Sequence, residues 1–451
     1  MPSQMVQQDM GKGSGRGGRR NFLRALCLTL VPVFVSQLMT TPLWASETAN
    51  VLSLPQLLEE ARRANPELLA ARKRWEAAQA KVPLSKGLPA PRIGVEFEEI
   101  PRGTVKLNQA TIMYQLIQAL PFPGKLSLRH QVAVKEAQVA AMAFKQAEWN
   151  ITSQLKNSYY DLFLLERELE IQQEQLLWIP QAVAAAQTKY AAGMASQAEV
   201  LRLQGEQLSA SNEIMVLTHR HQAMAAHINH LLNRPVHEPI GSPEAIQLVP
   251  IPFSLEELMV TARERQPELL AFQFSAERAD AALRLAKREL LPDLETMVEL
   301  RDPAMGPFGP WDLTLALVIP FWFWTKLQYG VKVAVYDQAS AHAAYQAMQN
   351  EVARRIHEHW HEAFAAYGTA KLSRDGLIAL RKQAVMSASA AYQSGRGSFM
   401  ELLDALRSLG EQERTYDQQL VSLEQHVVML EQAVGVPLRE AHAAPAAGST
   451  P

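Results

Sequence analysis

Cysteine is almost absent from this chain, which has one, Cys27, among 451 residues. A single thiol excludes an intramolecular disulfide and a zinc site built from several thiolates. Cys27 lies in a segment that we expect to be removed, and Leu26 before it is not the small residue of lipoprotein processing sites. The mature chain is therefore predicted to have no disulfide, no thiolate metal site and no lipid on cysteine.

The chain also lacks a large net charge and lacks phosphate-binding motifs. Lys and Arg number 44 against 46 Asp and Glu, which leaves a formal net charge of -2. A chain without a basic field is not expected to bind nucleic acid. The sequence has no glycine-rich phosphate loop and no nucleophile elbow. We therefore predict no cofactor.

Long apolar runs are scarce, and one short run lies close to the amino terminus. Basic residues, the last of them Arg24, precede an apolar run at 25–35, and Leu43-Trp44-Ala45 follows it. This order is typical of a signal peptide, which we place at 1–45. The run is shorter than the roughly 20 residues that a membrane helix needs. Arg19-Arg20 also fits a twin-arginine signal, so the export route stays open.

What the sequence does contain is an internal repeat. Ten of the nineteen positions from Ser53 to Ala71 are identical to the residues 201 positions further on. This identity indicates a tandem duplication, with a first repeat at 46–238 and a second at 254–438. The segment 239–253 between them holds four prolines and is predicted to be an extended strap. The tail 439–451 is predicted to be disordered.

Each repeat contains one predicted β-hairpin, where the hydrophobic period changes from 3.6 to 2. The strands are expected at about 92–100 and 110–120, and at about 293–301 and 311–320. One face of each strand is apolar and the other carries charged or small residues. About ten residues per strand is the length of a tilted outer-membrane strand. A water-soluble hairpin with one buried face fits the same pattern, so the alternation alone leaves both open.

Both hairpins lead into long helical sequences, from Lys125 to Tyr190 and from Leu327 to Tyr392. At 1.5 Å per residue each would be about 100 Å long. Each ends in the frame Y-x-x-G-x-x-S-x-x-E, which places tip turns at 190–198 and 392–400. Glycine lets the chain leave one helix, and serine caps the next helix, which runs back antiparallel. Pro180 is expected to kink or break its helix.

The number of strands predicts assembly. Four strands cannot close a barrel, and an open sheet edge in lipid leaves backbone groups unpaired at several kcal/mol each. Three copies would supply twelve strands, within the range of about 8 to 26 known for such barrels. The sequence therefore predicts a mostly α chain with a small β part that several copies complete.

These features together resemble the TolC-type outer-membrane efflux factors, the exit ducts of tripartite pumps and type I secretion systems. The resemblance covers 51–438 and rests on the duplicated element order, on L-P-F-P-G-K at 120–125 and on the two tip turns. It implies a homotrimer whose α-barrel is continuous with a 12-stranded transmembrane β-barrel in outer-membrane lipid. The implied partners are a periplasmic adaptor (membrane fusion) protein and an inner-membrane efflux pump of the RND type.

The resemblance also assigns residues at the tip. The turn residues that match adaptor-contacting positions are Gly193, Ser196, Gly395 and Ser398. Glu401 and Asp404 match an acidic pair that lines the closed entrance, and their spacing of three places both on one helix face. In a threefold ring they would hold cations and repel anions. The first repeat has Glu199 and Arg202 instead, and two ordinary solvated carboxylates are the alternative.

A histidine-rich stretch raises the question of an enzyme. Residues 357–361 fit H-E-x-x-H, the zinc motif of metalloproteases. A zinc protease also needs a third ligand and a cleft, and this motif lies within a long helical sequence, so we predict no enzyme. His357 and His361 share a helix face and are weak candidates for loose metal binding. A solvated or inter-helix role is favoured for them, and for His219, His221, His227 and His230.

The predicted function is passive export from a pump and adaptor across the outer membrane. L-P-F-P-G-K and the histidines favour heavy-metal cations as the exported solute, followed by drugs or solvents. Type I protein secretion is the alternative within this class. A soluble periplasmic coiled-coil scaffold, which would suit twin-arginine export, is the alternative of another class.

Overall fold

The computed structural model describes residues 51–98, 111–301, 311–321 and 323–439. These residues belong to one compact unit, Ala49–Pro451. The predicted signal peptide lies outside the described residues, as does the predicted tail after Arg439. Arg439 itself is described and forms an ion pair with Glu424, so its assignment to a disordered tail is wrong.

The first stretch of the chain runs through four helices and a hairpin. Its elements are α1 (Leu54–Ala64), α2 (Pro66–Leu84), β1 (Arg92–Glu98), β2 (Thr111–Leu120), α3 (Lys125–Ala191) and α4 (Gln197–Leu231). Asn65 separates α1 from α2 and accepts backbone hydrogen bonds from Glu67 and Leu68. The break falls there because the residue before a proline avoids the helical region. Ser53 occupies the N-cap position of α1 but its side chain makes no capping hydrogen bond.

The second stretch repeats this order with two π-helical turns added. Its elements are α5 (Leu255–Arg265), α6 (Pro267–Arg288), β3 (Asp293–Arg301), β4 (Trp311–Val318), η3 (Phe323–Leu327), α7 (Gln328–Leu372), η4 (Ser373–Leu377), α8 (Ile378–Gln393) and α9 (Phe399–Val434). Ser254 forms a full capping box with Glu257 at the start of α5. The two stretches therefore share one sequence of helices and strands.

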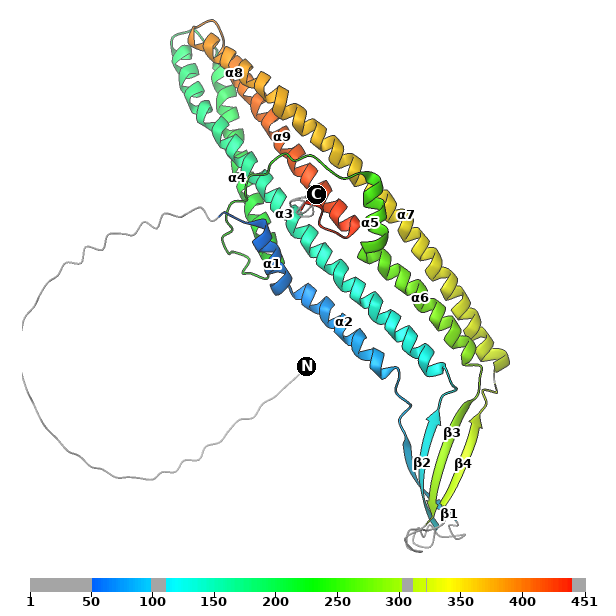
Figure 1. Cartoon of the computed structure of the whole chain (residues 1–451). Coiled ribbons are helices and arrows are strands. Elements are labelled where there is room, and N and C mark those ends of the chain that lie inside the picture. Colours follow the sequence, from blue (N-terminus) through cyan, green and yellow to red (C-terminus); the bar gives the residue numbers. More distant parts are fainter. Residues whose placement is uncertain (1–50, 99–110, 302–310, 322, 440–451) are drawn as a thin grey trace, which may run out of the picture. The chain divides into compact units, whose positions relative to one another are not determined.

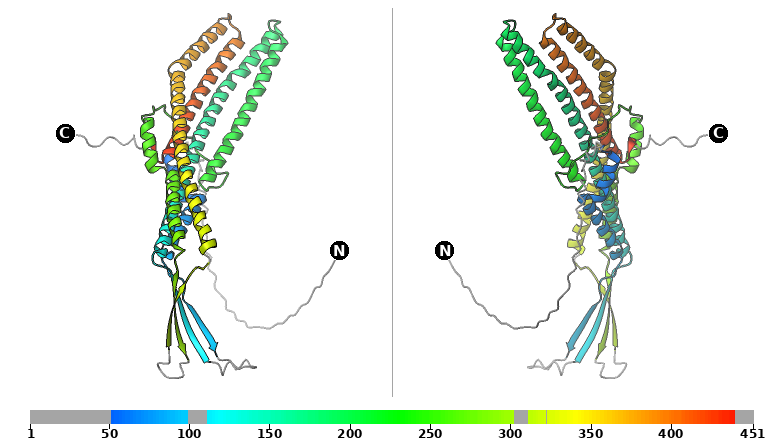
Figure 2. Two further views of the ribbon diagram at one scale, coloured as in Figure 1. Left: turned by 90° about the vertical axis from the view of Figure 1, so that its right-hand side faces the viewer. Right: turned by 90° about the vertical axis from the view of Figure 1, so that its left-hand side faces the viewer.

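The four strands form one antiparallel sheet in the order β1-β2-β3-β4. Pairing of β2 with β3 joins the hairpin of the first stretch to that of the second. The strands lie at one end of the long helices, and the α3–α4 and α8–α9 turns lie at the other end (Figures 1 and 2). All four strands fall within the residue ranges predicted from the period of two.

The long helices differ from prediction at two places. Pro180 was expected to kink or break its helix, and the break does not occur, because Pro180 lies inside the 67-residue helix α3. Ile179, Ala182 and Val183 around it are buried, and this packing offsets the missing backbone hydrogen bond. The second long helix was expected to be uninterrupted, but η4 separates α7 from α8. A π-helical turn holds an extra residue, and here it places the Ser373 hydroxyl against the Gln412 amide.

Separate apolar clusters hold the helices together. One contains Leu57, Leu155 and Ile228 and joins α1, α3 and α4. A second contains Leu258, Ile356 and Leu430 and joins α5, α7 and α9. A third lies near the tip turns. Among the described helices, none is both long and apolar enough to span a membrane.

Candidate functional site

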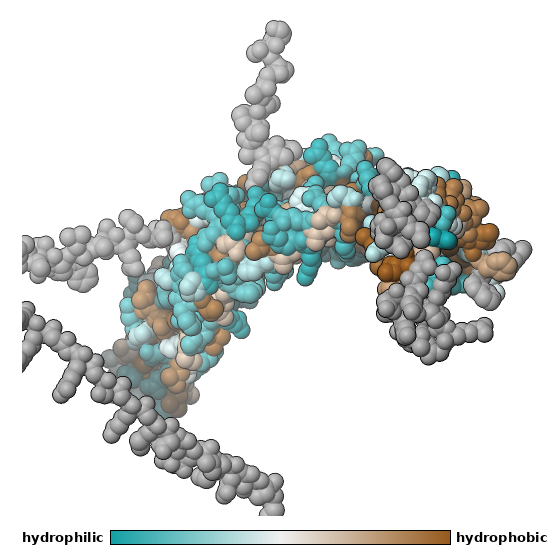
Figure 3. Space-filling model, turned by 90° about the horizontal axis from the view of Figure 1, so that it is seen from below, coloured by the Kyte–Doolittle hydropathy of each residue, from teal (hydrophilic) through white to brown (hydrophobic). Residues whose placement is uncertain are grey.

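One face of the sheet is apolar and open to its surroundings. The register places Ile93, Leu116, Val298 and Leu313 in one row across all four strands. Their exposed fractions are 81, 47, 40 and 55%. Viewed from the sheet end, brown apolar surface gathers around the strands, whereas the helices are mostly teal (Figure 3). The predicted apolar face is confirmed, and these four side chains are exposed in the part of the chain that the structure describes.

The opposite face of the sheet carries charged and amide side chains, with Met113, Ile117 and Met297 among them. The neighbouring row places Gln115 between Gly94 and Glu299, and its amide donates to Glu299 at 2.8 Å and, diagonally, to Glu96. Arg92 crosses the sheet and forms an ion pair with Glu295 at 3.0 Å. A sheet with one apolar and one charged face has the residue distribution of a membrane barrel wall that encloses water.

The outer strands of the sheet each have one partner. Within the described residues β1 pairs with β2 alone and β4 pairs with β3 alone. All eight residues of β4 are exposed, including Trp311, Leu315 and Leu317. The outer backbone groups of both edges therefore need a partner in any place from which water is excluded.

The L-P-F-P-G-K sequence forms the junction between sheet and helices. Gly124 adopts a φ of 93°, which favours glycine, and starts α3. Lys125 follows, and its side chain is only 4% exposed, with Nζ 2.7 Å from Asp293 and 2.8 Å from the Leu291 carbonyl. Asp293 also accepts a hydrogen bond from the Phe122 backbone N–H at 2.7 Å. The motif thus ties the end of β2 to the start of β3.

Both tip turns have the backbone that their sequence frame predicts. Gly193 and Gly395 have φ values of 72° and 74°, in the left-handed region. A Cβ at either position would meet no atom within 4 Å, so the backbone angle and not crowding favours glycine there. The two turns are open to contact from outside the chain.

The serines of the two turns cap the following helices, with one difference. Ser196 accepts a hydrogen bond from the Glu199 backbone N–H. Ser398 accepts one from the Glu401 N–H, and the Glu401 side chain accepts one from the Ser398 N–H in return. The second turn therefore has a complete capping box, and the first has only the serine half.

The predicted acidic pair lies on the exposed side of α9, but its charges have local partners. The Glu401 carboxylate is 3.2 Å from the Ser398 N–H that it caps. Asp404 lies 3.9 Å from Arg407, which forms a closer ion pair with Glu206 of α4. Of the two carboxylates, Asp404 is thus the more available to an ion. Arg202, the corresponding residue of the first turn, is exposed.

His357 and His361 lie side by side on the exposed face of α7. Their ring centroids are 4.5 Å apart. Glu358 of the H-E-x-x-H motif binds Arg354 at 2.5 Å, so it does not face the two rings as a general base. Among the described residues, no three His, Cys, Asp or Glu side chains converge on one point.

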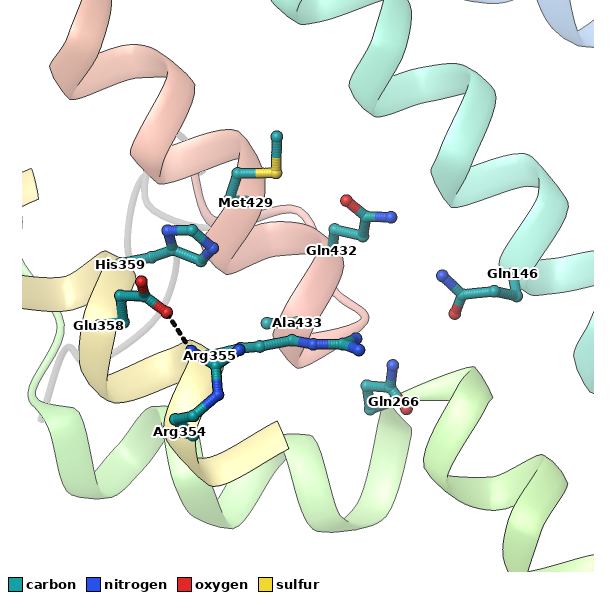
Figure 4. Close-up of a pocket in the computed structure, with 9 residues that line it drawn as sticks. All are labelled: Gln146, Gln266, Arg354, Arg355, Glu358, His359, Met429, Gln432 and Ala433. Atoms are coloured by element: carbon teal, nitrogen blue, oxygen red, sulfur yellow. Dashed lines mark hydrogen bonds and ion pairs between the residues drawn. The ribbon is translucent and has the colours of Figure 1, made fainter. Parts of the chain in front are cut away.

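A second pair of histidines lies between helices. Nδ1 of His359 on α7 is 3.4 Å from Nδ1 of His426 on α9. Burial, and then the neighbouring His426, lower the pKa of His359, and burial also lowers the pKa of His426. His359 lines a pocket of about 380 Å³ with Arg354, Arg355 and Met429 (Figure 4). Sequence reasoning missed this pair because its members come from helices distant in the sequence.

The seam between α3 and α9 is polar, which the sequence analysis also missed. Its contacts are Lys156 to Glu431 at 2.6 Å, Arg167 to Asp417 at 3.2 Å and Gln425 to Asp161 at 2.8 Å. One signal was present, because Asp417, Glu424 and Glu431 are spaced by seven residues and share a helix face. All three are buried. Burial raises the pKa of the Asp417 and Glu424 carboxyl groups, and Arg167 and Arg439 oppose it.

The fold and its surfaces define a class of protein: a chain whose small sheet has one exposed apolar face and whose long helices extend away from it. The sequence model of the family described as outer membrane efflux protein matches residues 57–234 and 258–436. The chain belongs to this family. Its location in the outer membrane is thereby confirmed, and the soluble scaffold is excluded. The family is one of efflux channels, so the metalloprotease interpretation of H-E-x-x-H is excluded as well.

Individual proteins agree with this assignment. The cobalt-zinc-cadmium resistance protein CzcC of Cupriavidus metallidurans is 20% identical over 371 residues, which cover 82% of this chain and 86% of that protein. The solved structure of the outer membrane protein VceC from Vibrio cholerae has a TM-score of 0.73 at 17% identity, covering 85% of this chain and 96% of VceC. CusC, solved in work on transmembrane channel formation, has a TM-score of 0.72 at 17% identity and covers 85% and 92%. At these identities the solved structures establish the fold alone.

Proposed function

We propose that the chain is a tandem duplication and that three copies form one duct, with their sheets joined into a 12-stranded barrel and their long helices forming a periplasmic α-barrel below it. The observation that carries this proposal is the sheet with one open apolar face and two single-partner edges. In lipid such edges must pair, and pairing β4 of one copy with β1 of the next satisfies both. The similar order of elements in the two stretches supports the duplication.

The proposed duct has no energy source of its own. We assign its supply to an inner-membrane efflux pump of the RND type, connected through a periplasmic adaptor (membrane fusion) protein. The two exposed glycine turns at the end opposite the sheet are the proposed adaptor contacts, through Gly193, Ser196, Gly395 and Ser398. Their open surroundings support this role, because a partner reaches them without moving other side chains.

The proposed cargo is the class of heavy-metal cations. The similarity to the cobalt-zinc-cadmium resistance protein supports this choice over drugs or solvents, and over type I protein secretion. The test is a deletion strain complemented with the gene. We expect restored growth on zinc or cobalt salts and unchanged sensitivity to drugs, and the reverse pattern would assign the duct to drug efflux.

Substitutions at two adjacent residues of the edge strand β4 test the proposed barrel. Leu315 is 64% exposed on the apolar face, and Thr314 next to it points to the polar face. Arginine on a lipid face costs about 2–4 kcal/mol near the bilayer midplane, and a lumen position tolerates it. We expect Leu315→Arg to abolish the heat-sensitive trimer in the outer-membrane fraction and Thr314→Arg to retain it. Equal trimer yields from both variants would refute the lipid-facing assignment.

Single-channel conductance tests the proposed gate of Glu401 and Asp404. In planar bilayers we expect Glu401→Ala with Asp404→Ala to raise conductance and weaken block by divalent cations. Because Glu401 caps its helix, Asp404→Ala alone should account for most of the lost block. Glu199→Ala with Arg202→Ala at the first turn is the matched control and should leave the block unchanged. A double variant at 401 and 404 that behaves like wild type would remove the gate from these residues.

A further inference from the structure

The His359–His426 pair is distinct from the surfaces that the proposed function uses. The two rings come from α7 and α9, at the end of α9 far from the tip turns, and their centroids are 5.6 Å apart at an interplanar angle of 38°. Both residues are half-buried between the helices. Because the two imidazoles come from different helices, the packing of α7 against α9 fixes their relative position.

The separation of the two facing nitrogens matches that of a metal site. Zinc binds imidazole nitrogen at about 2.0–2.1 Å in tetrahedral geometry, which places two ligand nitrogens about 3.3–3.4 Å apart. The two Nδ1 atoms here are 3.4 Å apart. An ion can therefore bind both nitrogens with little movement of either helix.

Further donors lie one helical turn away on each helix. Glu362 follows His359 by three residues on α7, so the two share a face, and Met429 stands in the same relation to His426 on α9. Figure 4 shows Met429 beside His359 at the pocket. A carboxylate and water suit a divalent ion of intermediate softness, whereas a thioether suits Cu(I).

The positive charges at this pocket are compensated in part, because Arg354 and Arg355 have carboxylate partners but still contribute, after burial, to the lowered pKa of His359. Arg354 forms ion pairs with Glu351 and Glu358, and Arg355 forms them with Glu351 and Glu268. The charges of Glu358 and Glu362 also act, against the effect of burial, to raise the pKa of His426, so they favour a positive charge at that ring. A cation at the two imidazoles thus meets carboxylates as well as guanidinium groups.

We propose that His359 and His426 bind one divalent cation of the zinc and cobalt class between α7 and α9, with water completing the coordination and Glu362 acting only through its charge. Each Nδ1 supplies a lone pair to the ion, and the ring hydrogens reside on Nε2. In the metal-free pair, one Nδ1 carries a hydrogen and donates it to the other Nδ1. When the ion binds, this hydrogen moves through solvent to Nε2 of the same ring. Both rings stay neutral, so binding releases no proton. The bound ion links the two helices.

Cobalt is the probe, because tetrahedral Co²⁺ has an intense visible absorption that octahedral aqueous Co²⁺ lacks. The full chain is purified in detergent without a histidine tag and titrated with Co²⁺ at pH 8, where imidazole is neutral. We expect one Co²⁺ per chain with the tetrahedral spectrum, displaced by Zn²⁺. His426→Gln removes the α9 ligand and leaves every α7 histidine in place. It should weaken binding by on the order of tenfold or more, which is about 1.4 kcal/mol.

Three controls separate this site from its alternatives. His357→Ala with His361→Ala removes the exposed pair on the same helix and should retain the tetrahedral Co²⁺. His359→Gln, from the other helix, should repeat the loss seen with His426→Gln, and an unchanged trimer on gel filtration shows that both variants fold. Met429→Leu should bind Co²⁺ as wild type does.

Two results would overturn the proposal. The first is equal Co²⁺ binding by wild type and His426→Gln, which would mean that the pair is only hydrogen-bonded. The second is loss of binding in the His357→Ala, His361→Ala variant, which would place the ion on the exposed face of α7. Binding is measured on the isolated chain, so either result is independent of whether the duct exports metals.

Discussion

Helix α9 has two sides that pack by different means. Towards α7 it presents Leu423, Val427 and Leu430, all at most 1% exposed, against apolar residues such as Ile356. Towards the middle of α3 it presents paired acids and amides. The apolar side joins helices of one stretch, and the polar side joins the two stretches.

The two kinds of packing differ in how strictly they fix the relative position of the helices. Apolar packing is non-directional, and its free energy scales with the area removed from water. Ion pairs and hydrogen bonds require matched geometry, and a buried charge that loses its partner is costly. The α7 side of α9 should therefore supply most of the stability, and the α3 side should determine the register between the stretches.

The largest effect is expected on the apolar side. Leu423 is fully buried against Ala363 and Ala366 of α7. Leu423→Ala leaves a cavity among side chains too small to fill it, so we expect a loss of about 3 kcal/mol in unfolding free energy. Guanidinium unfolding in detergent, followed by tryptophan fluorescence, measures it. Leu423→Met should cost much less, and equal losses for the two variants would show that this side is not close-packed.

An intermediate effect is expected at the seam. Glu431 is 1% exposed, binds Lys156 at 2.6 Å and accepts the Leu438 backbone N–H. Glu431→Gln removes the charge that Lys156 needs, and we expect a loss of about 2 kcal/mol. Gln418→Ala, at an exposed contact of the same seam, should be nearly neutral. If Glu431→Gln cost more than Leu423→Ala, the polar side would be the stronger one.

The smallest expected effect is a pH dependence from Asp417. Burial raises its pKa in the folded state, with Arg167 opposing, above the unfolded value of about 3.9. A raised carboxyl pKa contributes stability below the unfolded pKa and loses it as pH rises through the folded pKa. Asp417→Asn should remove this decline, so its stability relative to wild type rises from pH 4 to pH 7. Parallel unfolding curves over that range would contradict the assignment.

The elements could be predicted from the sequence because their signals are local. The alternation at Ile93, Val95 and Phe97 depends on neighbours along the strand, and the turn at Gly193 depends on one backbone angle. The exceptions arose where packing overrides a local preference. Pro180 stays inside α3 because its neighbours are buried, and η4, which contains Gly376, interrupts a sequence whose overall pattern predicts one continuous helix.

The candidate sites were only partly visible for the same reason. Glu401 and Asp404 were found from their spacing, but the contact of Arg407 with Glu206 joins two helices and has no local signature. The pairs His359 with His426 and Lys156 with Glu431 join residues 67 and 275 positions apart. From the sequence alone, a charged or imidazole side chain on a helix is predicted to be solvated. Only the tertiary structure shows which second helix packs against it.

The sequence by itself determined the order of helices and strands, the two glycine turns and which face of each strand is apolar, because periodicity and backbone preference act within a few residues. Tertiary structure alone decided the strand order β1-β2-β3-β4, the polar seam of α9 and the meeting of the two imidazoles. Those features depend on the free energy of bringing distant segments together, which no short window of sequence contains.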